Sequence, residues 1–139
     1  MPLPKPTPGL VIHHDYLWRH EAMAGADKGV KRRPVAIIVA ITGTAGAVSV
    51  TVAPITHTPP AGAASGILLP AKVKQHLGLD ADPSWVITND LTIFVWPGED
   101  LYPVPNTPPG TYDYGFLPPA LFDQIRQEIL RHSTAPTPR

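Results

Sequence analysis

Residues 35–55 read VAIIVAITGTAGAVSVTVAPI and form an apolar run without a charged side chain. Val, Ile and Thr dominate the run, and its second half alternates apolar and polar residues with the period of two that is typical of a half-buried strand. Two glycines interrupt the middle, where a turn is easily formed. The run predicts a β-hairpin with a strand at 35–41 buried on both faces, a turn at 42–46, and a partner strand at 47–55.

The alternative for this run is a membrane span. It is long enough to cross a bilayer, and the basic residues before it fit the positive-inside rule. The interrupting glycines and the β-branched composition favour the hairpin. Prolines at positions 2, 4, 6 and 8 also break any apolar segment of a secretion signal. We therefore expect no membrane association and a cytoplasmic location.

Length and composition indicate one folded domain. The chain has 139 residues, 11 basic and 11 acidic side chains, and 19 prolines. A chain of this length buries enough surface for one core, so we expect a single domain over 1–139, with an extended arm at 1–8 and a frayed tail at 133–139. The absence of cysteine excludes disulfides, a thiolate nucleophile and cysteine-based metal sites.

Short β-type runs and proline-rich loops alternate outside the hairpin. Leu121, Phe122, Ile125 and Ile129 recur at helical spacing and predict an amphipathic C-terminal helix after a Pro-Pro pair. The absence of a regular strand–helix alternation favours a mainly β fold, a small SH3-like antiparallel barrel with short helices and this C-terminal helix. The other expected elements are a first strand within 10–18, loops at 19–31, 56–66 and 101–114, a short helix at 72–77, and a hairpin-like pair at 84–88 and 91–96.

A candidate site lies at the open end of the central hairpin. The start of one antiparallel strand lies beside the end of its partner, so Arg33 and Thr56 are expected to be neighbours. A guanidinium fork and a hydroxyl together suit a phosphate group. His57 adds a side chain of a type that titrates near neutral pH. The alternative is a solvated charge run and an ordinary strand end, and the spacing alone favours this structural interpretation.

Three motifs follow one another in the first part of the chain: PGLVI at 8–12, KRRPVAII at 31–38 and VAPIT at 52–56. Their order and spacing resemble the MazF/PemK/Kid family of type II toxin–antitoxin endoribonucleases. The resemblance implies a homodimeric barrel that cleaves single-stranded mRNA without a metal or another cofactor, leaves 2′,3′-cyclic phosphate and 5′-hydroxyl ends, and inhibits growth. It also implies a cognate antitoxin protein that blocks the RNA channel with a disordered acidic segment.

The resemblance also implies roles for individual residues. The arginine before the proline and the threonine that ends the third strand are catalytic in the family, which assigns catalysis here to Arg33 and Thr56. Asp90 is the candidate for an assisting acidic residue on a later strand, and His57 is an alternative proton-transfer group because it follows Thr56. The basic residues expected to contact RNA are Lys28, Lys31 and Arg32.

Other side chains of chemical interest have a structural alternative. Histidines and acids cluster between 13 and 21, but neighbouring strand residues such as His13 and His14 point to opposite faces, so we expect no metal site. Aromatic side chains offer stacking platforms for unpaired bases, although core packing is the commoner role of each. These aromatic residues are Trp18, Trp85, Trp96 and Tyr102.

A second function class stays open beside the nuclease. A net charge of zero, a leucine at position 10 where the family usually has an acidic residue, and proline-rich loops are also compatible with a catalytically silent barrel. Such a barrel would bind a partner protein or a nucleic acid. The two hypotheses differ in whether RNA is cut and in whether cleavage depends on Arg33 and Thr56.

Overall fold

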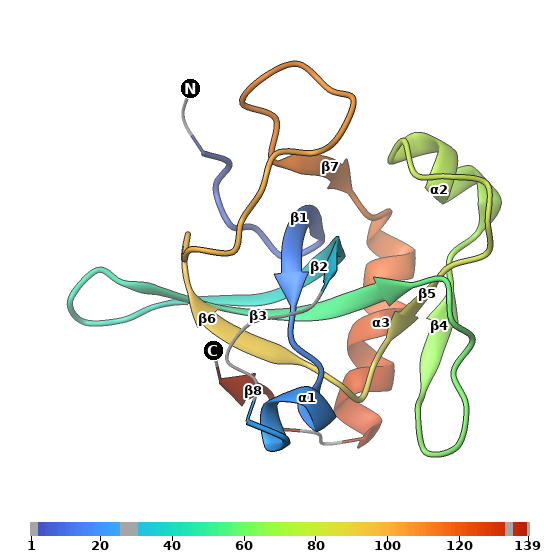
Figure 1. The fold of residues 1–139 in the computed structure, drawn as a ribbon, viewed down its shortest axis with the longest axis horizontal. Coiled ribbons are helices and arrows are strands. Elements are labelled where there is room, and N and C mark those ends of the chain that lie inside the picture. Colours follow the sequence, from blue (N-terminus) through green and yellow to red (C-terminus); the bar gives the residue numbers. More distant parts are fainter. Residues whose placement is uncertain (1–2, 26–30, 133–134, 139) are drawn as a thin grey trace.

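A curled antiparallel sheet makes up most of the molecule (Figure 1). The computed structural model describes residues 3–25, 31–132 and 135–138. Its elements are β1 (Leu10–Tyr16), α1 (Arg19–Met23), β2 (Lys31–Thr42), β3 (Val48–Thr56), β4 (Gly66–Leu68), α2 (Ala71–His76), β5 (Trp85–Ile87), β6 (Thr92–Val95), β7 (Asp113–Phe116), α3 (Pro119–His132) and β8 (Thr137–Pro138). The strand order is β4-β5-β3-β2-β1-β7, with β6 paired to β3 and β8 paired to β6.

The central hairpin forms as the apolar run predicts. β2 and β3 pair antiparallel, with Val35 opposite Pro54 and a register shift between Ile37 and Val39. The tip of the hairpin projects from the left side of the molecule in Figure 1. The prediction of a hairpin in place of a membrane span is therefore confirmed for this segment. Among the described residues, no helix combines the length and the apolar character that a membrane crossing requires.

Alternate side chains of the hairpin enter two hydrophobic clusters. Val35 and Ile37 belong to one cluster, and Ala36 and Ile38 belong to the other, because successive strand residues face opposite sides of the sheet. All four are buried, as predicted for a strand covered on both faces. The prediction is wrong for the last part of 35–41, where Val39 and Ile41 are exposed as the hairpin extends beyond the two clusters.

The predicted pairing of residues 84–88 with 91–96 is wrong. Residues 84–88 and 91–96 were expected to pair with each other, but β5 pairs with β3 and β4, and β6 pairs with β3 and β8. β3 is long enough to accept β5 near its end and β6 near its start. Asn89 and Asp90 do not make a tight turn because their side chains bond to segments elsewhere, including the backbone of Ser65 and of Arg19.

Two segments expected to be irregular contain short elements. The loop predicted at 19–31 begins with helix α1, whose Arg19 backbone N–H donates to the Asp90 carboxylate and so satisfies a free donor of the first turn. The tail predicted to fray contains β8, which pairs parallel with β6, and Thr137 N donates a hydrogen bond to Leu91 O just before β6 at 2.7 Å. The local sequence of neither segment shows these distant partners.

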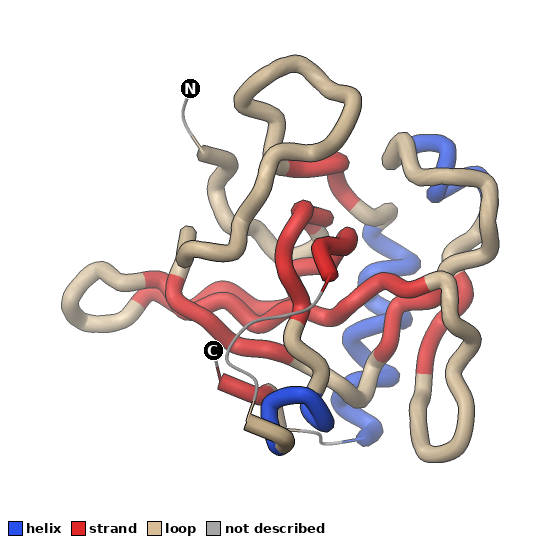
Figure 2. Tube along the Cα trace, viewed as in Figure 1, coloured by secondary structure: helices blue, strands red, loops and turns tan. Residues whose placement is uncertain are grey.

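Two helices of the expected kind complete the fold. α2 ends at His76, close to the end of the predicted helix at 72–77, with Leu77 as its C-cap residue and a positive φ of 70° at Gly78. α3 buries Ile125 and Ile129 in the cluster that contains Val11, and it crosses behind the sheet in Figure 1. Figure 2 shows that strands dominate and that long loops line the margin. The predicted mainly β class with a C-terminal amphipathic helix is confirmed.

Candidate active site

The register of the central hairpin brings Arg33 and Thr56 together. Continuing the register two steps beyond the pair of Val35 and Pro54 sets Arg33 against Thr56 at the open end of the hairpin, which we call the edge. Both residues line two clefts that lie on either side of this edge. The larger, which we call the Trp18 cleft, has a volume of about 550 Å³ and is also lined by Trp18 and Asp90. The smaller, the His57 cleft, adds Lys31, Arg32, His57 and Asp80.

Arg33 and Thr56 line both clefts, and each contacts a neighbouring group that orients it. The guanidinium carbon of Arg33 lies 5.2 Å from the centre of the Trp18 ring, a cation–π distance that orients the planar group. Thr56 is mostly buried, and its Oγ1 accepts a hydrogen bond from the backbone N–H of Thr58 at 3.1 Å. The threonine hydroxyl keeps its own hydrogen for donation. The edge therefore offers a guanidinium and a hydroxyl donor, the groups that bind a phosphate.

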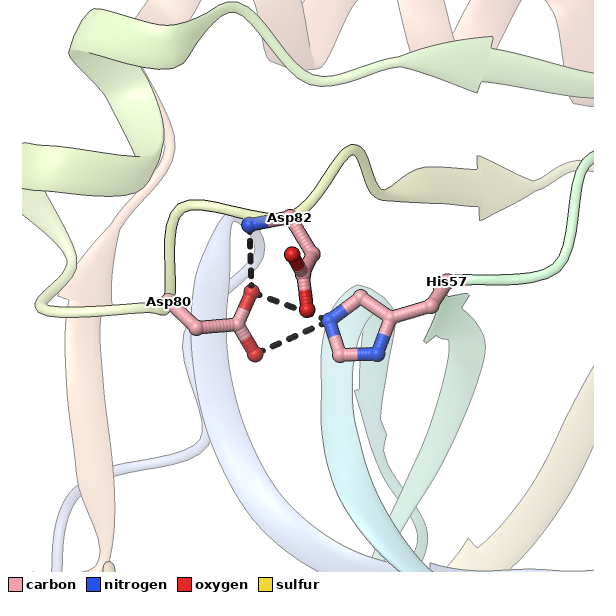
Figure 3. Close-up of side chains that lie close together, drawn as sticks. All are labelled: His57, Asp80 and Asp82. Atoms are coloured by element: carbon pink, nitrogen blue, oxygen red, sulfur yellow. Dashed lines mark hydrogen bonds and ion pairs between the residues drawn. The ribbon is translucent and has the colours of Figure 1, made fainter.

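His57 makes a close contact with a carboxylate from another part of the chain. Its Nε2 lies 3.0 Å from Oδ1 and 2.9 Å from Oδ2 of Asp80, in the loop between α2 and β5 (Figure 3). Asp80 also accepts a hydrogen bond from Lys74 at 2.9 Å and from the backbone N–H of Asp82 at 3.1 Å. The Lys74 hydrogen bond is the main cause that lowers the pKa of the Asp80 carboxyl, His57 lowers it further, and partial burial opposes both.

This lowered pKa makes the stability of the protein depend on pH. A carboxyl whose pKa is lower in the folded state stabilises that state above its unfolded pKa, and the contribution is lost as the pH falls through the folded pKa. We expect wild type to be more stable than Asp80→Asn at about pH 6, and the difference to shrink towards about pH 3. Urea unfolding of both proteins across this range measures it. An unchanged difference over the whole range contradicts the assigned contact.

Three side chains of metal-ligating type lie together around His57. One ligand atom each of His57, Asp80 and Asp82 lies within 4.8 Å of the others, and all three residues are exposed. Lys74 already places an ammonium group on Oδ1 of Asp80. The short contact between Nε2 and the Asp80 carboxylate is a hydrogen-bond distance. The cluster therefore has the geometry of a histidine–carboxylate pair stabilised by a buried lysine.

Asp90 lies in the wall of the Trp18 cleft with several partners. The hydroxyl of Tyr16 donates to its backbone oxygen at 2.7 Å and to Oδ1 at 2.8 Å, and the backbone N–H of Arg19 lies 3.3 Å from Oδ2. Burial, helped by the Asp90 charge, raises the pKa of Tyr16 far above its usual range. Asp90 thus joins β1 and α1 to the segment after β5, and its oxygens face these partners.

Replacement of Tyr16 by Phe tests this structural role. The variant leaves two Asp90 oxygens without their donor, and we expect a loss of about 1–3 kcal/mol in the free energy of unfolding. Tyr112→Phe is the matched control, because the Tyr112 hydroxyl makes no hydrogen bond within the described part of the chain. Chemical denaturation of the three proteins measures the difference. Equal losses in the two variants contradict the role of the Tyr16–Asp90 contact.

Some of the basic and aromatic residues predicted to bind RNA line the His57 cleft, and others line the Trp18 cleft. Lys31 is exposed, and the side chain of Arg32 is 56% exposed with its guanidinium carbon 3.5 Å from the centre of the Tyr102 ring. Lys28 lies outside the described residues. Trp18 and Trp96 both pack against a core cluster, as the structural alternative predicts, and Trp18 also lines the larger cleft. The exposed cations and one tryptophan therefore surround Arg33 and Thr56.

The histidines of β1 do not join the site. His13 bonds through Nδ1 to the Tyr114 hydroxyl at 2.8 Å, and His14 stacks on Phe94 with ring centres 4.5 Å apart. These partners belong to different faces of the sheet, as the alternation of strand side chains predicts. No sequence pattern points to Asp80 or Lys74 as residues of the site. The Lys-Val-Lys run before Gly78 looks like part of an ordinary surface helix. The contact of Asp80 with His57 arises only when the chain folds.

No family model, curated protein or solved structure matches this chain. The resemblance to the MazF/PemK/Kid family rests on the three motifs quoted above.

Proposed function

We propose that this protein is a metal-independent endoribonuclease that cuts single-stranded RNA at the edge formed by Arg33 and Thr56. One observation carries the proposal: a guanidinium, a hydroxyl donor and a carboxylate-paired imidazole line one small cleft. Charge stabilisation by a fixed cation and proton transfer by an imidazole are the two contributions that cleavage of a phosphodiester next to a 2′-hydroxyl requires. The fold itself does not imply this activity.

The reaction is an internal transfer at phosphorus. The ribose 2′-oxygen forms a bond to the adjacent phosphorus while its proton passes to His57, and the bond from phosphorus to the 5′-oxygen breaks. The leaving 5′-oxygen takes a proton from solvent, which reaches the half-exposed His57 cleft. Arg33 and Thr56 stabilise the charge on the non-bridging oxygens. The products are a 2′,3′-cyclic phosphate and a 5′-hydroxyl.

The surroundings of the edge suit unpaired RNA. The Trp18 cleft is within the size range of small-molecule sites, and its tryptophan offers a ring on which a base can stack. Lys31 and Arg32 add positive charge beside the scissile phosphate although the net charge of the chain is zero. Binding is therefore local, and we expect it to weaken as the salt concentration rises.

Replacement of Thr56 by Val tests the proposal with little change of shape. Thr56→Val removes the hydroxyl donor to the phosphate, and we expect a decrease in kcat of about tenfold to a hundredfold on a long unstructured RNA in EDTA. The matched control is Thr51→Val on the same strand, outside both clefts. Denaturing gels of time courses measure the rates. If wild type leaves the RNA intact, the nuclease is excluded, and fluorescence anisotropy of labelled RNA then tests the silent binding barrel.

The wider role that we propose is that of a cytoplasmic growth-inhibiting toxin, active on mRNA as a homodimer and neutralised by an antitoxin. An exposed apolar face on the central hairpin and β6 supports a protein partner. Ile41 is 62% exposed and Val95 is 57% exposed, and both pair with Ser49 between them, so they lie on one face. Apolar surface of this kind is commonly covered by another chain. Exposed cations at the RNA site also suit an acidic antitoxin segment.

A further inference from the structure

We propose that Asp80 is a positioning residue that holds the His57 ring for proton transfer, and that the buried Lys74 holds Asp80. The inference rests on the proposed nuclease function, and it assigns the residues that orient the proposed general base His57. Asp80 lies 23 residues after His57, on the far side of α2.

The contact fixes which ring nitrogen carries the hydrogen. An ionised carboxylate only accepts hydrogen bonds, so the Nε2 atom that faces both Asp80 oxygens is the donor. The neutral ring then has its acceptor lone pair on Nδ1. Figure 3 shows Nδ1 on the side of the ring that faces away from Asp80 and Asp82. Nδ1 is therefore the atom that accepts the proton of the 2′-hydroxyl.

Lys74 explains why an exposed carboxylate stays in place. The Asp80 side chain is 54% exposed, whereas that of Lys74 is 5% exposed. The ammonium of Lys74 donates to Asp80, to the backbone oxygen of Asp82 and to Ser84 Oγ at 2.7 Å. Three acceptors around one buried cation fix the loop after α2, because moving Asp80 away would leave a buried charge without its counter-charge. Lys74 thus makes the loop rigid where His57 needs a fixed partner.

The positive charge around the His57 cleft is the reason that His57 needs the Asp80 carboxylate when it accepts a proton. Lys31, Arg32 and Arg33 line the same cleft and oppose the positive charge that His57 gains when it accepts a proton. Asp80 faces the ring directly and offsets this repulsion as the imidazolium forms. An uncharged partner such as Asn would hold the ring less firmly and would not stabilise its charge.

Steady-state cleavage of one fluorescent single-stranded RNA in EDTA tests the inference. The proteins are wild type, His57→Gln, Asp80→Asn, the double variant, and Asp82→Asn as the matched control. We expect Asp80→Asn to lower kcat at least tenfold with KM nearly unchanged, because Asp80 does not touch the substrate. In the His57→Gln background, Asp80→Asn should have almost no further effect, since Asp80 acts through the ring. Asp82→Asn should keep wild-type rates.

Three results would overturn the inference. They are an active wild type that Asp80→Asn leaves unchanged, a full additional loss from Asp80→Asn in the His57→Gln background, and equal losses for Asp80→Asn and Asp82→Asn. In parallel reactions without EDTA, a change of these rates on addition of Mn²⁺ or Zn²⁺ would identify the last case as a metal site. An inactive wild type instead contradicts the proposed nuclease. If Asp80→Asn unfolds, Lys74→Met combined with Asp80→Asn removes both charges together, and a kcat equal to that of wild type in this folded double variant would likewise overturn the inference.

Discussion

Arg33→Ala is expected to lower kcat for RNA cleavage about a hundredfold to a thousandfold, the loss typical of removing one fixed donor from a developing anion. Arg33 lines both clefts together with Thr56 and is oriented by the Trp18 ring. No other guanidinium in the described residues lines both clefts, so another arginine cannot replace it without moving β2. The measurement is the single-turnover rate with saturating enzyme, which separates chemistry from binding.

Two companion variants make this result specific. Arg33→Lys keeps the charge but loses the planar fork, and we expect an intermediate rate. Arg126→Ala removes an exposed arginine of α3 that lines neither cleft, and we expect the wild-type rate. The assignment of Arg33 fails if Arg33→Ala cleaves as fast as Arg126→Ala. Circular dichroism of each variant confirms that the comparison is made between folded proteins.

The second large effect concerns the stability of the central hairpin. Ile37→Ala is expected to lower the free energy of unfolding by about 2–5 kcal/mol, because it removes a fully buried aliphatic side chain and leaves a cavity. Ile37 has 0% exposure and packs in the cluster with Val50 and Val52. Urea unfolding followed by tryptophan fluorescence measures the change.

The same strand provides the matched control. Ile41 is four residues further along β2 and is 62% exposed at the projecting tip, so Ile41→Ala is expected to change the free energy of unfolding by less than about 0.5 kcal/mol. Similar losses in the two variants would contradict the assignment of one side chain to the core and the other to the surface. A larger loss in Ile41→Ala at high protein concentration only would point to a covered face.

The sequence predicted those parts of the fold that depend on local patterns. The hairpin at 35–55 follows from composition, period and glycines, and the helix at the C-terminus follows from the spacing of Ile125 and Ile129. The pairing of β5 and β6 with β3 did not follow, because Asn89 and Asp90 look like a tight turn until their distant partners are known. A local pattern cannot show which strand a short β-type run will join.

In the candidate site too, some residues could be predicted from local sequence patterns and others depend on tertiary contacts. The neighbourhood of Arg33 and Thr56 was predictable, since the geometry of an antiparallel hairpin requires it. The pair of His57 and Asp80 was not, because it depends on how α2 and its following loop fold back onto the end of β3. Asp90 was predicted near the site and lines the Trp18 cleft, but its partners Tyr16 and Arg19 come from tertiary contacts that no motif shows.

The chemistry at the ends of RNA fragments tests the central claim most directly. A defined single-stranded RNA is incubated in EDTA with wild type and with Arg33→Ala, and the fragments are analysed by mass spectrometry beside the same RNA carrying 2′-deoxyribose at the cut positions. The account expects wild type to leave 2′,3′-cyclic phosphate and 5′-hydroxyl ends, with no cut at a 2′-deoxy position and almost none by Arg33→Ala. Cutting at a 2′-deoxy position, 5′-phosphate ends, or intact RNA with wild type would contradict it.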